Sequence, residues 1–285
     1  MPARLRPAFA AFALAVAGCG LPSPTHGTVV EPGVASADFQ ARANDTDLVT
    51  VHVFFPADEH GAPTQHSLPG LVFVQGGLVD TSRYAWQALA LAHQGYVVAV
   101  PEHPLELAFF AIDQGRVARE LLVNPAPSSL LASLVDPARL AVAGHSLGGV
   151  VAMKLALEGG FRAVVLEASF PDTADSAQLP GFSHPSLSLA GSSDCSAKLE
   201  NVRTGWNTLP SPTALLVVPG MTHYEFTNAA TEDLKSCTPS TSLDDAHAAI
   251  TGALVTFLGQ TVAHDGAIDA AALQAAVPSA TVEVR

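Results

Sequence analysis

The sequence RLAVAGHSLGGVVAMKLAL at residues 139–157 decides the fold. Its opening part, residues 139–143, is an apolar run of the kind that forms a strand buried on both faces. Its closing part, residues 148–157, is apolar and rich in helix formers, and Gly159-Gly160 follows as a stop signal. The segment therefore predicts a strand that passes through a very short turn directly into a helix.

The turn itself is Gly144-His145-Ser146-Leu147-Gly148, which has the pattern Gly-x-Ser-x-Gly. The two outer glycines are needed because a turn this sharp would drive side chains at their positions into neighbouring backbone. The same turn exposes the serine at the N-terminus of the next helix, where negative charge is stabilised. Ser146 is therefore the candidate nucleophile, and the alternative is a glycine-rich turn with an inert serine.

The rest of the chain alternates short apolar runs with segments of helical spacing. Predicted strands lie at residues 48–55, 70–74, 96–100, 162–166, 186–190 and 214–218. Predicted helices lie at residues 84–93, 107–122 and 243–258. This alternation predicts an α/β fold with a mostly parallel central sheet and helices on both faces. Functional side chains in such sheets gather in the loops after the carboxyl ends of the strands.

The candidate base is His223, which follows the predicted strand 214–218. A serine hydroxyl is a weak nucleophile and needs a base that is held by a third group, and in this type of fold the chain order is serine, acid, histidine. The other downstream histidines are placed less well. His184 precedes a strand, His247 lies within a predicted helix, and His264 lies near the C-terminus.

The candidate acid is Asp194, in the loop that follows the predicted strand 186–190. Its position after a strand repeats that of His223, one strand earlier, so both side chains are expected at the same edge of the sheet. Three other carboxylates follow the strand at residues 162–166 and remain alternatives, as surface groups or substrate contacts. They are Glu167, Asp172 and Asp175.

An oxyanion that forms at the nucleophile needs two backbone N–H donors. One donor is expected from Leu147, the residue after the serine. The other is expected from the loop after residues 70–74, where Gly77 is the first choice and Leu78 the second. Gly76-Gly77 taken alone would indicate only a turn.

The layout of residues 45–260 resembles the α/β-hydrolase family. Residues 135–149 (VDPARLAVAGHSLGG) are especially similar to a branch that contains chlorophyllases, dienelactone-hydrolase-like enzymes and bacterial polyester hydrolases of the cutinase type. Residues 71–100 also resemble that branch, with Gly76-Gly77, a helix that carries Trp86, and then a buried strand. The resemblance implies Ser146, Asp194 and His223 as a catalytic triad, with Gly77 and Leu147 as the oxyanion donors.

The chain departs from this branch at three points. Phe170 stands near the position where the polyester hydrolases carry tryptophan, and Gly77 stands where they carry an aromatic residue. Ser146 occupies the position at which a dienelactone hydrolase has cysteine. Residues 167–185 are too few for a large helical lid, so we expect a shallow, open site in which Leu78 and Phe170 contact the substrate.

The N-terminus has the layout of a signal peptide, with Arg4 and Arg6 before a short apolar stretch. The run Val-Ala-Gly-Cys at residues 16–19 resembles the bacterial lipobox, which implies cleavage after residue 18 and a lipid on Cys19. The alternative is an ordinary secretory signal. The chain is therefore divided into a signal segment at 1–18, a tether and entry segment at 19–44, the hydrolase-like domain at 45–260 and a C-terminal tail at 261–285. Residues 21–40 are predicted to form the tether and an entry strand.

The cysteine count fits export. The sequence has 3 cysteines, and a lipid on Cys19 leaves Cys195 and Cys237 as a pair. An oxidising compartment favours a disulfide between them, and two free buried thiols are the alternative. We therefore expect a bacterial membrane-anchored lipoprotein on the periplasmic or the cell-surface side, or alternatively a secreted protein.

Composition narrows the function further. The net charge of -13 disfavours nucleic-acid binding, because an acidic surface repels phosphates. The leading hypothesis is a serine-dependent hydrolase of small carboxylic esters that needs no metal or cofactor and contacts the membrane only through its lipid anchor. The alternatives are a peptidase or amidase of the same fold, and a non-enzymatic surface lipoprotein that retains the fold.

Overall fold

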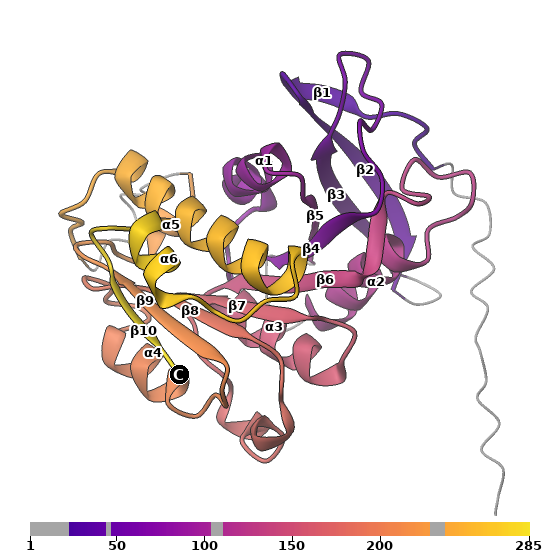
Figure 1. Cartoon of the computed structure of the whole chain (residues 1–285). Helices are drawn as coiled ribbons and strands as arrows, with labels where there is room; N and C mark the ends of the chain where they lie inside the picture. Colours follow the sequence, from indigo (N-terminus) through magenta and orange to yellow (C-terminus); the bar gives the residue numbers. More distant parts are fainter. Residues whose placement is uncertain (1–22, 44–46, 104–110, 229–236) are drawn as a thin grey trace, which may run out of the picture.

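The computed structural model describes residues 23–43, 47–103, 111–228 and 237–285 (Figure 1). The predicted signal segment 1–18 and Cys19 lie outside the described residues. Within them, ten strands form one sheet in the order β1-β2-β3-β5-β4-β6-β7-β8-β9-β10. The strands are β1 Thr28–Glu31, β2 Val34–Arg42, β3 Leu48–Pro56, β4 Leu68–Val74, β5 Val97–Pro101, β6 Val135–His145, β7 Ala163–Glu167, β8 Ser186–Gly191, β9 Thr213–Val218 and β10 Thr281–Val284.

The central strands from β5 to β9 are parallel, and the strands at both edges are antiparallel. Strands β4, β5, β7, β8 and β9 are buried along their whole length, which explains their largely apolar sequences. Because the central strands are parallel, the loops after β4, β6, β7, β8 and β9 meet at one edge of the sheet. This edge carries the candidate site.

Helices cover both faces of the sheet (Figure 1). Helices α1, α5 and α6 pack on one face, and α2, α3 and α4 pack on the other. Their bounds are α1 Ala85–His93, α2 Ala111–Val123, α3 Leu147–Glu158, α4 Leu199–Trp206, α5 Leu243–Leu258 and α6 Ala270–Ala276. The structure therefore has the predicted α/β fold, with a mostly parallel central sheet and helices on both faces.

The segment Leu243–Ala263, which contains α5, is long and apolar enough to span a membrane by composition, and it is the only such helix among the described residues. Its side chains Ile250, Leu254 and Phe257 are fully buried against the rest of the protein. The apolar composition of α5 is therefore that of a core helix.

The sheet reaches beyond residues 45–260 at both ends. Strands β1 and β2 lie in the predicted tether and entry segment, where the sequence predicts one entry strand, and α6 and β10 lie in the predicted C-terminal tail. Strand β10 pairs with β9 and covers one edge of the sheet. Strand β1 is exposed, β2 alternates buried and less buried positions over most of its length, and β10 is mostly half-buried, so their sequences lack the apolar runs of the central strands.

Helix α4 was not predicted. It has only eight residues, no side-chain N-cap, and a glycine near its end, so its helical signal is weak. Val202 and Trp206 nevertheless bury themselves against β8 and β9. The predicted helix at residues 107–122 corresponds to α2, whose described part begins at Ala111.

Candidate active site

Ser146 lies in the turn between β6 and α3 and has a strained backbone. Its φ of 54° and ψ of -124° are unusual for a residue with a side chain and cost about 1–3 kcal/mol. A Cβ atom on Gly144 would come within 2.3 Å of the carbonyl oxygen of Gly148, and one on Gly148 within 2.2 Å of the carbonyl oxygen of Val74. Both glycines are therefore required by close backbone contact, and together they allow the turn that presents the serine.

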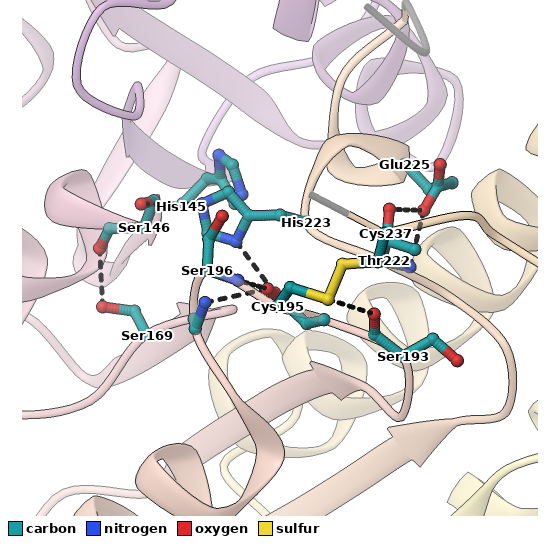
Figure 2. Close-up of polar contacts among 12 residues, drawn as sticks. His145, Ser146, Ser169, Ser193, Cys195, Ser196, Thr222, His223, Glu225 and Cys237 are labelled. Atoms are coloured by element: carbon teal, nitrogen blue, oxygen red, sulfur yellow. Dashed lines mark hydrogen bonds and ion pairs between the residues drawn. A yellow bond between two sulfur atoms is a disulfide. The ribbon is translucent and has the colours of Figure 1, made fainter. Parts of the chain in front are cut away.

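The structure brings Ser146, His223 and Asp194 into hydrogen-bond contact. Figure 2 shows Ser146 and His223 of this site. Ser146 Oγ lies 2.9 Å from His223 Nε2, and His223 Nδ1 lies 2.8 Å from Asp194 Oδ2. An ionised carboxylate only accepts hydrogen bonds, so Nδ1 carries the imidazole proton and Nε2 accepts from the serine hydroxyl. This is the arrangement in which a histidine can remove the serine proton.

Asp194 is held by the backbone of its own loop. Its Oδ1 atom accepts hydrogen bonds from the N–H groups of Ser196 at 2.7 Å and Ala197 at 2.8 Å. The Asp194 side chain is fully buried, so each of its oxygens has a fixed set of partners. The carboxylate therefore presents Oδ2 to His223 in one orientation.

The alternative acids are engaged elsewhere. Asp172 and Asp175 form ion pairs with Lys154 of α3, at 3.1 and 2.8 Å. Glu167, at the end of β7, accepts a hydrogen bond from Gln87 at 2.6 Å. None of these three carboxylates has a hydrogen bond to His223 among the described residues.

The disulfide between Cys195 and Cys237 is present in the structure. Cys195 directly follows Asp194, and Cys237 lies in the connection between His223 and α5 (Figure 2). The bond therefore ties the loop that carries the acid to the chain that follows the histidine, across 42 residues of sequence.

The loop that carries His223 is stabilised by a carboxylate that the sequence analysis did not identify. Glu225 is buried, and its Oε2 atom accepts hydrogen bonds from the backbone N–H and the hydroxyl of Thr222, both at 2.6 Å. Ser169, after β7, likewise donates a hydrogen bond to the carbonyl oxygen of Ser146 at 2.6 Å. These contacts fix the turns on either side of the triad, and no sequence motif marks them.

The two segments that carry the predicted oxyanion donors, the loop after β4 and the turn with Leu147, lie against each other. A Cβ atom on Gly77 would come within 2.8 Å of Leu147 Cδ1. The N–H of Gly76 already donates to the hydroxyl of Tyr84 at 2.9 Å, so the candidate donors left on this loop are Gly77 and Leu78. Leu78 and Leu147 are 68% and 38% exposed, which gives the site an open apolar rim.

Phe170 follows Ser169 at the carboxyl end of β7. It is half-buried, and its Cβ atom lies so close to Gly205 of α4 that a side chain at position 205 would collide with it. Between β7 and β8 the chain forms only two short 3-10 turns, Thr173–Asp175 and Leu179–Gly181. No helical lid lies in this stretch, as predicted.

The carboxyl group of Glu167 is fully buried behind the nucleophile turn. Its main-chain oxygen accepts the N–H of Ser146 at 2.8 Å, and its Oε2 atom has no hydrogen-bond partner among the described residues. Burial raises the pKa of Glu167 from 4.5 to about 8, although the hydrogen bond from Gln87 opposes the shift. The side chain is therefore protonated at neutral pH.

This protonation makes stability depend on pH. The folded protein holds a proton on Glu167 that the unfolded chain releases above pH 4.5, so the free energy of unfolding falls as pH rises from 4.5 to about 8. The slope from this one group reaches at most about 1.4 kcal/mol per pH unit. We expect Glu167→Gln, which keeps an acceptor for Gln87, to flatten the slope measured by urea unfolding in this range. The exposed Glu59→Gln serves as control, and an unchanged slope in Glu167→Gln would contradict the assignment.

Within the described residues, no group of three or more His, Cys, Asp or Glu side chains is arranged to hold a metal ion. The site consists instead of the hydrogen-bonded serine, histidine and aspartate, beside the two loops that carry the candidate N–H donors.

Comparison with known proteins agrees with this architecture. The model of the alpha/beta hydrolase family matches residues 70–233, which is more than half of the chain and includes Ser146, Asp194 and His223. No curated protein gave a significant match. The matched span runs from β4 past β9 and so contains the parallel part of the sheet together with the candidate site. The chain therefore belongs to the α/β hydrolase family.

Proposed function

We propose that the protein is a serine hydrolase that cleaves carboxylic esters through an acyl-enzyme intermediate. The observation that carries the proposal is the unbroken chain of hydrogen bonds from Ser146 through His223 to Asp194. A non-enzymatic protein has no need to hold a serine in a strained conformation against a histidine that is oriented by a buried carboxylate.

The proposed reaction begins when Ser146 Oγ attacks the ester carbonyl carbon and its proton passes to His223 Nε2. The carbonyl oxygen becomes an oxyanion, for which the N–H groups of Leu147 and of Gly77 or Leu78 are the proposed donors. The tetrahedral intermediate then breaks the bond between carbon and alcohol oxygen, and His223 returns the proton to the leaving alcohol. Asp194 stabilises the positive imidazole that exists between these two transfers.

Water then hydrolyses the acyl-enzyme. His223 takes a proton from the water, the hydroxide forms a bond to the acyl carbon, and the bond from that carbon to Ser146 Oγ breaks. The serine oxygen recovers its proton from His223, and the acid leaves. His223 is the base both in the formation of the acyl-enzyme and in its hydrolysis. The reaction requires no group beyond the triad and the oxyanion donors.

The open apolar rim of the site, formed by Leu78 and Leu147, supports the proposal that the substrate is an ester of a small or extended apolar acid. Leu78 and Leu147 stand exposed beside the serine, and the chain between β7 and β8 adds no cap. Exposed apolar side chains that flank a reactive group are typical of a binding surface for apolar substrate. Phe170 is a further proposed contact. The resemblance of residues 135–149 to the branch that contains chlorophyllases supports an ester as the substrate, whereas Gly77 and Phe170 depart from the polyester hydrolases.

The proposal is tested with a fluorophosphonate probe and a panel of substrates. We expect wild-type protein to be labelled at Ser146 and Ser146→Ala to remain unlabelled. We also expect p-nitrophenyl esters to be cleaved, with peptide p-nitroanilides left intact. Labelling that persists in Ser146→Ala, or cleavage of the anilides in preference to the esters, would contradict the proposal.

We also propose that the protein is exported and anchored by a lipid on Cys19. The disulfide is consistent with export, because such bonds persist in oxidising compartments. Mass spectrometry of the mature N-terminus tests this: a diacylated Cys19 is expected, and an unmodified N-terminus would indicate an ordinary secretory signal.

A further inference from the structure

Tyr84 is a buried tyrosine that connects the two loops beside the nucleophile. It ends the 3-10 turn Thr81–Tyr84, just before α1, and is 1% exposed. Its hydroxyl oxygen lies 2.9 Å from the backbone nitrogen of Gly76 and 2.8 Å from His145 Nδ1. Gly76 belongs to the loop after β4, and His145 is the residue before Ser146.

The two partners of the Tyr84 hydroxyl show which of its hydrogen bonds it accepts and which it donates. The N–H of Gly76 can only donate, so the hydroxyl oxygen accepts from it. The hydroxyl proton is buried, and His145 Nδ1 is the one acceptor within its reach among the described residues. Tyr84 therefore donates to Nδ1, and the proton of the His145 ring lies on Nε2.

Both partners are neutral, which suits this arrangement. Burial raises the pKa of Tyr84, and burial together with the neighbouring His223 lowers the pKa of His145 well below its usual value. The contact is therefore a neutral hydrogen-bond chain from Gly76 through Tyr84 to His145, closed off from water.

The space around this chain is tight. A Cβ atom on Gly76 would come within 2.9 Å of both His145 Nδ1 and the Tyr84 hydroxyl. The His145 ring in turn packs against His223, with 4.6 Å between ring centroids, and against Phe226, with 5.2 Å. A shift of the Tyr84 hydroxyl would therefore displace the loop after β4, the turn that carries Ser146 and the loop that carries His223.

We propose that Tyr84 is a positioning residue, whose hydroxyl sets the loop with the Gly77 and Leu78 N–H groups at the correct place relative to Ser146. This inference rests on the proposed serine hydrolase function. Tyr84 does not contact the reacting atoms; it acts through Gly76 and His145. Its loss should affect the stabilisation of the oxyanion more than the binding of the uncharged ester.

The direct test is Tyr84→Phe, which removes one oxygen and leaves the ring. We expect kcat for a p-nitrophenyl ester to fall about 10- to 100-fold, because loss of one oxyanion donor costs about 100- to 1000-fold and a displaced donor costs less. KM should stay within about twofold, since ground-state binding is unaffected. The matched control is Tyr96→Phe, which removes the hydroxyl of another buried tyrosine, directly before β5, and should leave kcat unchanged.

Labelling with a fluorophosphonate separates this inference from the proposed function. The tetrahedral phosphorus adduct places an oxygen where the oxyanion forms, so Tyr84→Phe should be labelled at Ser146 more slowly than wild type. Equal labelling rates and an unchanged kcat would overturn the role of Tyr84. A wild-type protein that is not labelled at all would overturn the serine hydrolase function, and the inference with it.

A measurement on the wild-type protein keeps the inference testable if Tyr84→Phe does not fold. Nitrogen-15 NMR of the histidine rings reports which ring nitrogen carries the proton. We expect His145 to be neutral with an unprotonated Nδ1. A proton on Nδ1 would show that Tyr84 does not donate to it and would overturn the inference.

Discussion

Replacing His223 by alanine is expected to lower kcat for a p-nitrophenyl ester about a millionfold, close to the rate set by the remaining N–H donors and substrate binding. The reason is that the Ser146 hydroxyl loses the only base in contact with it among the described residues, at 2.9 Å. His145 cannot replace His223, although their rings are 4.6 Å apart. Its Nδ1 atom is held by Tyr84, and the pKa of His145 is lowered by burial.

The matched control is His184→Ala. His184 is exposed and precedes β8, at the opposite end of the sheet from the triad. We expect its kcat to equal that of wild type. Each variant must be expressed and purified separately from wild type, because traces of wild-type enzyme would hide a loss of this size. Titration of the reactive serine measures how much wild-type enzyme is present. A kcat for His223→Ala within about a hundredfold of wild type would show that another group serves as base.

The sequence predicts the central sheet well because its strands are buried on both faces. Runs such as residues 70–74 and 214–218 are apolar without interruption, and no other local structure accounts for them as simply. At the edges, the pattern predicts a single entry strand where β1 and β2 form, and it predicts no strand where β10 forms. These edge strands are partly exposed, and their place in the sheet depends on pairing with distant strands, which a local pattern does not encode.

The chain order and the positions after strands were sufficient to select Ser146, Asp194 and His223 from many alternatives, and the structure places these three side chains in contact. Their catalytic roles stay a prediction until they are tested. The three side chains meet because parallel strands bring their carboxyl ends to one edge, so a position along the sequence translates into a position in space.

The supporting residues could not be predicted in the same way. The pattern predicts Tyr84 only as part of a helix, because its contacts with Gly76 and His145 join segments that are distant in sequence. Glu225 matches no motif, because its role rests on two hydrogen bonds to Thr222 that form only in the folded loop. Glu167 was recognised as a carboxylate at the end of a strand, but its neutral state follows from complete burial, which only the packed structure reveals.

Replacing Asp194 by asparagine is expected to lower kcat about 10,000-fold at neutral pH while the fold is retained. The backbone explains the size of the effect. The N–H groups of Ser196 and Ala197 both donate to Oδ1, so the amide oxygen of the asparagine must occupy that place. Its NH₂ group then faces His223 Nδ1, which is 2.8 Å from Oδ2 in the wild type.

Because an NH₂ group donates, Nδ1 would have to become the acceptor and the ring proton would move to Nε2. His223 could then no longer accept the proton of Ser146, and nitrogen-15 NMR should show the changed tautomer. The control is Asp172→Asn, which loses only an ion pair with Lys154 on the surface and should keep kcat within about twofold. If Asp194→Asn stayed within about tenfold of wild type, or if Asp172→Asn were equally impaired, the acid of the triad would have to be sought elsewhere.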